Sequence, residues 1–284
     1  MSETVNTARI KSLTILIPGL NGSGLELGQL PRFLENNGLE VLVPEIEGYL
    51  YGSPPGTFDS WLSQMNSLID SHLEKYDSIH LAGISMGATL ALALASQRSD
   101  ISNLILMSPV LKYDGWSVPW YRSLLDLFYQ LGVRNWKYAE REPYGVKNAD
   151  LRRRISEKFK TSEVSEVGAA SITARHLHAA KGLMGFADAN LHNITNRLLL
   201  IQSVEDDTCS VWSAKEILRR TSTELRRVIW LGNSYHIVTI DNEREIVLNE
   251  VLRFLERTDA ANQSMNANYS DRNLKKLKAR DVEE

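Results

Sequence analysis

The stretch Ile79-His80-Leu81-Ala82-Gly83-Ile84-Ser85-Met86-Gly87 joins an apolar segment to an alanine-rich one that continues to Ser96. Ile79 to Ala82 has the character of a buried β-strand, and Met86 to Ser96 that of a helix. The G-x-S-x-G pentad between them is typical of a nucleophile elbow, a strained turn that lifts a serine hydroxyl above the edge of a sheet. Glycine is expected at 83 and 87 because a side chain there would collide with neighbouring backbone in so sharp a turn. The pentad alone is weak evidence, so its context decides the interpretation.

Short apolar segments alternate with amphipathic segments on both sides of the pentad. The predicted strands cover residues 13–17, 39–43, 79–82, 104–107, 197–201 and 227–231, and the predicted helices cover 27–37, 58–76, 86–96, 214–220 and 243–256. Gly38 is expected to end the first helix as its C-terminal cap. This alternation predicts an α/β fold in which a mostly parallel central sheet has helices on both faces.

The alternation stops between residues 111 and 196. No clear buried strand can be recognised there, and helical patterns occur at 120–131, 150–160 and 172–186. We interpret this region as an inserted helical cap, so that residues 12–110 and 197–257 form the two parts of one core. Residues 258–284 are polar, carry a basic cluster at 275–278, and are expected to form a disordered tail because they cannot bury a face.

Composition limits the classes of protein that need to be considered. The chain has 284 residues, 43% of them hydrophobic, and a net charge of -3, which gives no field suited to nucleic acid. Cys209 is the single cysteine and is compatible with a reducing compartment. The N-terminus does not resemble a signal peptide, and no apolar run approaches the roughly 20 residues of a transmembrane helix. We therefore expect a cytoplasmic protein; the sequence does not predict its oligomeric state.

A serine hydroxyl is a poor nucleophile at neutral pH and needs an adjacent base, which in turn needs an orienting acid. In this type of fold the acid follows a late strand and the histidine follows the last one. His236 follows the last predicted strand, and Asp206 and Asp207 follow the strand before it. Either aspartate could reach the histidine; we favour Asp206, with Asp207 and Glu205 as supporting or solvated groups.

The developing oxyanion of acyl transfer needs hydrogen-bond donors. The backbone N–H of Met86, after the nucleophile, is one candidate, and that of Leu20, in the turn after the first strand, is the other. Asp241 is expected to be a helix N-cap. The other five histidines are expected to have surface or structural roles, and His176-Leu177-His178 is too closely spaced for a helical zinc pair. We therefore expect no metal and no cofactor.

These features together make the chain resemble the α/β-hydrolase superfamily, and within it the small bacterial carboxylesterases and monoacylglycerol lipases. The resemblance spans nearly all of residues 12–256 and implies Ser85, Asp206 and His236 as a catalytic triad, with Leu20 and Met86 as oxyanion donors. Three features depart from the family pattern. Pro18-Gly19 stands where the family usually has His-Gly, Ala88 replaces a second glycine after the elbow, and Gly48-Tyr49-Leu50-Tyr51-Gly52 replaces a Gly-His-Gly loop.

The predicted function is a serine hydrolase that cleaves a carboxylic ester or thioester with an apolar acyl group through an acyl-enzyme. Aromatic residues of the cap suggest an apolar pocket, with Trp116, Trp120, Tyr121 and Phe128 as candidate substrate contacts and Tyr129 and Trp136 as further members. An acyltransferase or thioesterase could use the same triad. A noncatalytic binding protein of this fold is a third alternative, which Ser85→Ala would distinguish.

Overall fold

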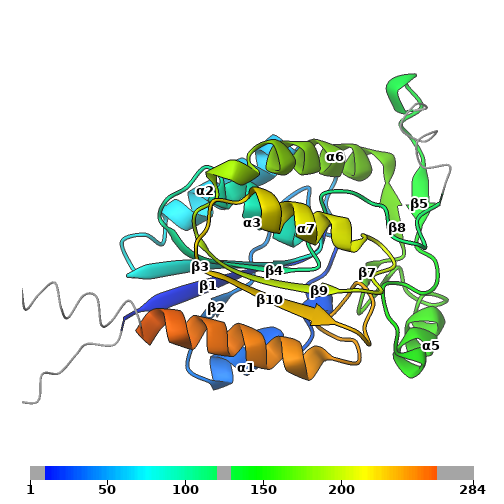
Figure 1. The fold of residues 1–284 in the computed structure, drawn as a ribbon. Helices are drawn as coiled ribbons and strands as arrows, with labels where there is room; N and C mark the ends of the chain where they lie inside the picture. Colours follow the sequence, from blue (N-terminus) through cyan, green and yellow to red (C-terminus); the bar gives the residue numbers. More distant parts are fainter. Residues whose placement is uncertain (1–9, 120–128, 261–284) are drawn as a thin grey trace, which may run out of the picture.

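A computed structural model describes residues 10–119 and 129–260, and its centre is a six-stranded parallel sheet (Figure 1). The strand order is β10-β9-β4-β3-β1-β2, and every neighbouring pair is parallel. The strands are β1 (Ser12–Ile17), β2 (Glu40–Leu42), β3 (Ser78–Ile84), β4 (Ile101–Met107), β9 (Arg197–Ser203) and β10 (Arg226–Leu231). The predicted parallel central sheet is therefore confirmed.

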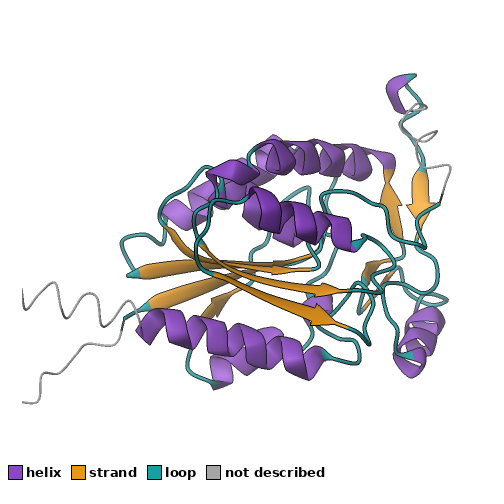
Figure 2. Cartoon of the chain, viewed as in Figure 1, coloured by secondary structure: helices purple, strands orange, loops and turns teal. Residues whose placement is uncertain are grey.

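Helices cover both faces of this sheet (Figures 1 and 2). One face carries α2 (Phe58–Asp70), α3 (Met86–Ala95), α6 (Ala174–Ala189) and α7 (Val211–Arg220), and the other carries α1 (Leu30–Asn36) and a helix over residues 244–260. The alternation of side chains along a strand divides the core accordingly. Leu13, Ile15 and Ile17 of β1 join the first hydrophobic cluster, whereas Leu16 joins the second.

Two helix ends differ from the sequence prediction, and one agrees with it. Gly38 has a φ of 79° and its N–H donates to the carbonyl of Glu35, so it caps α1 as expected. The helix predicted over 58–76 ends at Asp70 and continues as turns. The last helix extends to residue 260, and Thr258 within it is buried, so the segment predicted to be a tail contributes three residues to this helix. Residues 261–284 lie outside the described part of the chain.

The region predicted as a helical cap contains short strands as well as helices. Strands β5 (Lys137–Ala139) and β8 (Ser171–Thr173) pair antiparallel, as do β6 (Val164–Ser165) and β7 (Gly168–Ala169). The sequence contains no clear buried strand in this region, and pairs of two or three residues are too short to produce a recognisable pattern. The helix α5 (Ala149–Lys158) lies beside these strands (Figure 1).

The helix α6 also belongs to the sequence predicted as cap, but it packs in the helical layer over α3. Ala179, Ala180, Leu183, Met184 and Ala187 join the same hydrophobic cluster as the buried residues of α3. The inserted sequence therefore contributes to the core as well as to the cover of the sheet edge. Within the described residues, no helix is both long and apolar enough to cross a lipid bilayer.

Candidate active site

Ser85 lies at a sharp turn between β3 and α3. Its φ of 57° and ψ of -124° are unfavourable for a residue with a side chain, and such strain persists only where the surroundings enforce it. A Cβ on Gly83 would lie 2.3 Å from the carbonyl oxygen of Gly87, and a Cβ on Gly87 would lie 2.3 Å from those of Ile17 and Pro18. The steric need for both glycines is therefore confirmed.

Ser85, His236 and Asp206 form a continuous hydrogen-bonded chain. His236 Nε2 lies 2.7 Å from Ser85 Oγ, and His236 Nδ1 lies 3.0 and 2.8 Å from the two carboxylate oxygens of Asp206. Each residue follows a different strand, β3, β10 and β9, at the carboxyl edge of the sheet, where loops of parallel sheets form binding sites. The three residues singled out from the sequence are thus brought together.

The surroundings of Asp206 stabilise its ionised form. Besides His236, the carboxylate accepts hydrogen bonds from the backbone N–H groups of Thr208 and Cys209, both at 2.9 Å, and from Gln202 Nε2 at 2.8 Å. Burial acts to raise the pKa of Asp206, but the charge of His236 and these hydrogen bonds outweigh it and lower the pKa below its ordinary value. Asp206 can therefore remain an anion next to the histidine.

For the imidazole of His236, the neighbouring charges act in the opposite direction and raise the pKa. Burial acts to lower the pKa of His236, but the neighbouring carboxylates, Asp206 first, oppose it and leave the pKa above its ordinary value of 6.5. The side chain is buried, so its orientation is fixed by Asp206 on one side and Ser85 on the other. An imidazole held in this way can take a proton from Ser85 Oγ and return it.

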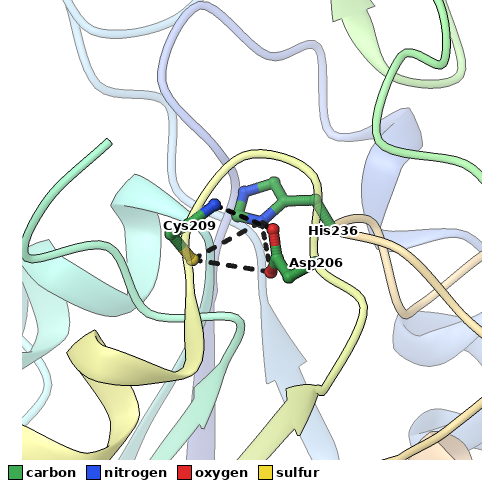
Figure 3. Close-up of side chains that lie close together, drawn as sticks. All are labelled: Asp206, Cys209 and His236. Carbon is green, nitrogen blue, oxygen red and sulfur yellow. Dashed lines mark hydrogen bonds and ion pairs between the residues drawn. The ribbon is translucent and has the colours of Figure 1, made fainter. Parts of the chain in front are cut away.

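Cys209 is a neighbour that the sequence did not indicate (Figure 3). Its Sγ lies 3.5 Å from Asp206 Oδ2 and 3.9 Å from His236 Nδ1, and burial raises the pKa of the thiol well above its ordinary value. Asp206, Cys209 and His236 offer ligand atoms within 4.8 Å of one another and form the one such group found in the described residues. Asp206 and His236 are already hydrogen-bonded, so a metal ion there would compete with that bond.

Asp207 forms hydrogen bonds to the inserted region. Its Oδ2 accepts hydrogen bonds from Ser117 Oγ and from the backbone N–H of Gly145, both at 3.3 Å, and its backbone carbonyl accepts two more from Ser117. Burial raises the pKa of Asp207 above its ordinary value. Of the two neighbouring aspartates, Asp206 therefore lies beside His236 and Asp207 links the acid loop to the insertion.

The two predicted oxyanion donors lie beside the serine. Leu20 and Met86 both line the cavity that contains Ser85, and a Cβ on Gly19 would lie 3.8 Å from Ser85 Cβ. Met86 is the first residue of α3, where backbone N–H groups have no partner within the helix. The turn after β1 and the start of α3 can thus present N–H groups to an oxygen bound near Ser85.

The cavity above Ser85 has a volume of about 630 Å³. Its apolar lining comes from the turn after β1, from the elbow and from the insertion, with Leu20, Met86, Leu111, Tyr113, Val118, Tyr129, Trp136, Tyr138, Ile172 and Met184 among its members. Charged side chains, including Lys112, Glu140, Arg141 and Asp188, also line it. The cavity therefore combines an apolar lining with a charged part that the sequence did not predict.

Only some of the predicted substrate contacts are found to line the cavity. Tyr129 and Trp136 line the cavity. Trp116 is not among the residues that line the cavity: this side chain is 61% exposed, its Nε1 donates to the carbonyl of Glu205, and its ring lies edge-on to Tyr235. An aromatic residue in the insertion can cover a loop from outside as readily as line a pocket, and sequence cannot separate the two. Trp120, Tyr121 and Phe128 lie outside the described residues.

Two cavity residues acquire significance only from the structure. His178 stacks on Tyr129 with ring centroids 4.2 Å apart and lines the cavity, although it was expected to have only a structural or surface role. Glu140 lines the cavity with a side chain that is partly exposed. Desolvation by the surrounding groups raises its pKa from 4.5 to about 7, with further contributions from Asp207, which raises it, and His236, which lowers it. Neither residue had a motif that marked it.

Asp241 has more contacts than the predicted helix cap would have. Its carboxylate is fully buried and accepts backbone hydrogen bonds from Tyr235, Asn242, Lys147 and Asn148. The helix that follows begins only at residue 244. Asp241 therefore joins the histidine loop to the insertion, a contact across more than ninety positions that sequence periodicity cannot reveal.

This fold, with a serine at a strained elbow and a histidine and aspartate in line with it, defines an α/β hydrolase. A family model described as serine aminopeptidase, S33, matches residues 8–244, and the chain belongs to that family. It is similar to a carboxylesterase of Bacillus subtilis (strain 168), with 25% identity over 252 residues that cover 86% of this chain and 92% of the relative.

A second relative matches the same share of this chain. The thermostable monoacylglycerol lipase of Bacillus sp. (strain H-257) is 22% identical over 246 residues, covering 86% of this chain and 90% of the relative. Among solved structures, the monoacylglycerol lipase of Paleococcus ferrophilus has a similar fold, with a TM-score of 0.73, 16% identity, and coverage of 87% of this chain and 94% of that one. The chain is thus similar to these enzymes over nearly their whole length.

Proposed function

We propose that this protein is a serine esterase that cleaves carboxylic esters with an apolar acyl group through an acyl-enzyme on Ser85. The observation that carries the proposal is the chain from Ser85 Oγ to His236 and Asp206, which opens onto a cavity lined in part by apolar and aromatic side chains. The two bacterial relatives, a carboxylesterase and a monoacylglycerol lipase, support the substrate class.

In the proposed reaction, His236 Nε2 accepts the proton of Ser85 as Oγ attacks the ester carbonyl carbon. Asp206, bonded to Nδ1, stabilises the imidazolium that forms. The N–H groups of Leu20 and Met86 would donate to the oxyanion of the tetrahedral intermediate. When the intermediate collapses, His236 gives its proton to the leaving alkoxide, and the same residue then activates water to release the acid.

The test is hydrolysis of a series of p-nitrophenyl esters from acetate to palmitate, with labelling of Ser85 by a fluorophosphonate. We expect hydrolysis and labelling in the native protein, and loss of both in Ser85→Ala, whose rate should fall by about 10⁴-fold or more. A folded native protein that neither releases nitrophenol nor reacts with the fluorophosphonate contradicts the proposal.

The family's description as a serine aminopeptidase calls for a second set of substrates. Aminoacyl p-nitroanilides present a free amino group next to a scissile amide, and the same triad could attack them. We expect esters to have a much higher kcat/KM than anilides, because apolar and aromatic side chains make up much of the cavity lining. A thioester substrate and an added alcohol acceptor in the same assay would detect the thioesterase and acyltransferase alternatives.

A further inference from the structure

One peptide unit in the turn after β1 is held at both of its polar atoms. Tyr49 Oη donates a hydrogen bond to the carbonyl oxygen of Pro18 at 2.9 Å, and the N–H of Gly19 donates to Glu26 Oε1 at 3.0 Å. Pro18 O and Gly19 N belong to the same peptide, which is planar, so the two bonds together fix its orientation. Both side chains are buried, with exposed fractions of 0% for Tyr49 and 2% for Glu26.

The next peptide unit carries the N–H of Leu20. Its carbonyl oxygen, on Gly19, accepts a hydrogen bond from the N–H of Gly22 at 3.1 Å. In a trans peptide the N–H points opposite to the carbonyl, so holding Gly19 O also directs the Leu20 N–H. Glu26 supports this turn further, because its Oε2 accepts from the N–H of Ser23 at 3.3 Å. The peptide that carries the proposed oxyanion donor and the peptide before it are therefore both fixed.

Tyr49 itself is held rigidly. Its ring lies edge-on to that of Trp61, with centroids 5.1 Å apart. Its backbone carbonyl accepts from the N–H of Asn21 at 2.9 Å, and the N–H of Tyr51 donates to the carbonyl of Gly22 at 3.0 Å. The loop around Tyr49 thus runs alongside the turn of residues 18–22 and bonds to it at three points.

The contact between the Tyr49 loop and the turn of residues 18–22 joins two of the segments that depart from the family pattern. Pro18 stands where the resembling family usually has histidine, and the loop Gly48-Tyr49-Leu50-Tyr51-Gly52 stands where it has Gly-His-Gly. The structure brings the two altered segments into direct contact through the bond from Tyr49 to Pro18. Proline has no N–H and no polar side-chain atom, so the turn must be held from outside at this position.

We propose that Tyr49 and Glu26 are positioning residues that aim the Leu20 N–H at the oxyanion. The inference rests on the proposed function, because it requires an acyl-transfer reaction at Ser85. Tyr49 is not among the residues that line the cavity, so it would act on the reaction only through the turn. Loss of an oxyanion donor lowers kcat by about 10²–10³-fold in other serine hydrolases. A misdirected donor should cause a smaller decrease in kcat.

The first test compares Tyr49→Phe with Tyr51→Phe. Tyr49→Phe keeps the ring against Trp61 and removes only the hydroxyl, and we expect kcat to fall by about tenfold with KM nearly unchanged. Affinity for a trifluoromethyl ketone, which forms an oxyanion on Ser85, should fall by the same factor. Tyr51→Phe is the matched control, since its hydroxyl bonds to Glu163 at the surface, and it should leave both values unchanged.

The second test uses two substitutions of Glu26. Glu26→Gln keeps an oxygen that can accept from Gly19 N, whereas Glu26→Ala leaves that N–H without its partner, so kcat should be lower in Ala than in Gln. Thermal unfolding and circular dichroism identify variants that have lost the fold. A loss of fold alone should lower the active fraction without changing ketone affinity per active site, measured by fluorophosphonate titration.

The outcomes separate the two proposals. A native protein without esterase activity overturns the proposed function and this inference with it. A native enzyme that is active while Tyr49→Phe keeps native kcat and ketone affinity overturns the inference alone. The same holds if Tyr49→Phe and Tyr51→Phe lose activity equally, because the effect would then not depend on the bond to Pro18.

Discussion

The carboxylate of Asp241 accepts a hydrogen bond of 2.8 Å from the backbone N–H of Tyr235, the residue before His236. The same carboxylate accepts from Lys147, Asn148 and Asn242 at 2.7, 2.9 and 2.9 Å. A fully buried charge is tolerated when it has this many donors. The loop that carries the histidine is therefore anchored through a carboxylate that also holds the inserted region.

Asp241→Ala should destabilise the protein and slow the reaction. Four backbone N–H groups lose their acceptor around a buried carboxylate, and we expect the free energy of unfolding to fall by roughly 3 kcal/mol. Urea denaturation measures this loss, and kcat measured under folding conditions should also fall because the histidine loop is less well held. Asp150→Ala is the control: this side chain is exposed and pairs with Arg153 on the same helix, so we expect a change within about 0.5 kcal/mol. Equal effects of the two substitutions would contradict the anchoring role.

The rate should fall at acidic pH as His236 becomes protonated. Only the neutral imidazole can accept the proton of Ser85, and the carboxylates around it hold its pKa above 6.5. A plot of kcat/KM against pH should therefore have its acid limb at an apparent pKa above 6.5. In Asp206→Asn the limb should move to lower pH, and the rate should fall by about 10³–10⁴-fold. A limb that does not move in this variant would argue against the assigned pair.

Glu140 should make stability depend on pH. Its pKa in the folded protein is about 7, against an ordinary value of 4.5, so folding favours the protonated carboxyl. The associated stability is present below about pH 4.5 and is lost as the pH rises toward about 7, and it is small because solvent screens this exposed side chain. Glu140→Gln removes this loss, so its free energy of unfolding relative to the native protein should increase across that range. A difference between the two proteins that is constant with pH would exclude the effect.

The elbow glycines can be tested against a glycine with free space around it. Gly83→Ala and Gly87→Ala place a Cβ 2.3 Å from backbone oxygen, and we expect a loss of roughly 3 kcal/mol or more, or failure to fold. Gly185 lies within α6 with nothing within 4 Å of a Cβ, so Gly185→Ala should stabilise by about 0.5–1 kcal/mol. Thermal unfolding of the three variants gives the comparison. Tolerance of alanine at 83 or 87 would disprove the steric argument.

Strand order explains which features the sequence could predict. Ser85 and His236 follow strands with strong apolar patterns, so their place at the carboxyl edge of the sheet follows from the fold. Asp206 and Asp207 are neighbours in one turn, and only the course of that turn decides which one meets the histidine. The carboxylate of Glu26 and the hydroxyl of Tyr49 act through contacts between loops. No periodicity records such contacts, and for the same reason the sequence could not show that Trp116 lies outside the cavity lining.

The contacts of Asp207 also bear on how such a protein could change its substrates. Ser117 and Gly145 both bond to this one residue, so the two ends of the segment 118–144 meet at the acid loop, while β5 within the segment pairs with β8. That segment supplies Tyr129, Trp136 and Tyr138 to the cavity wall but none of the three residues of the hydrogen-bonded chain. Asp207 thus holds both ends of this segment. Evolution or an engineer could exchange it for another of different length and chemistry while the reaction centre stays as it is.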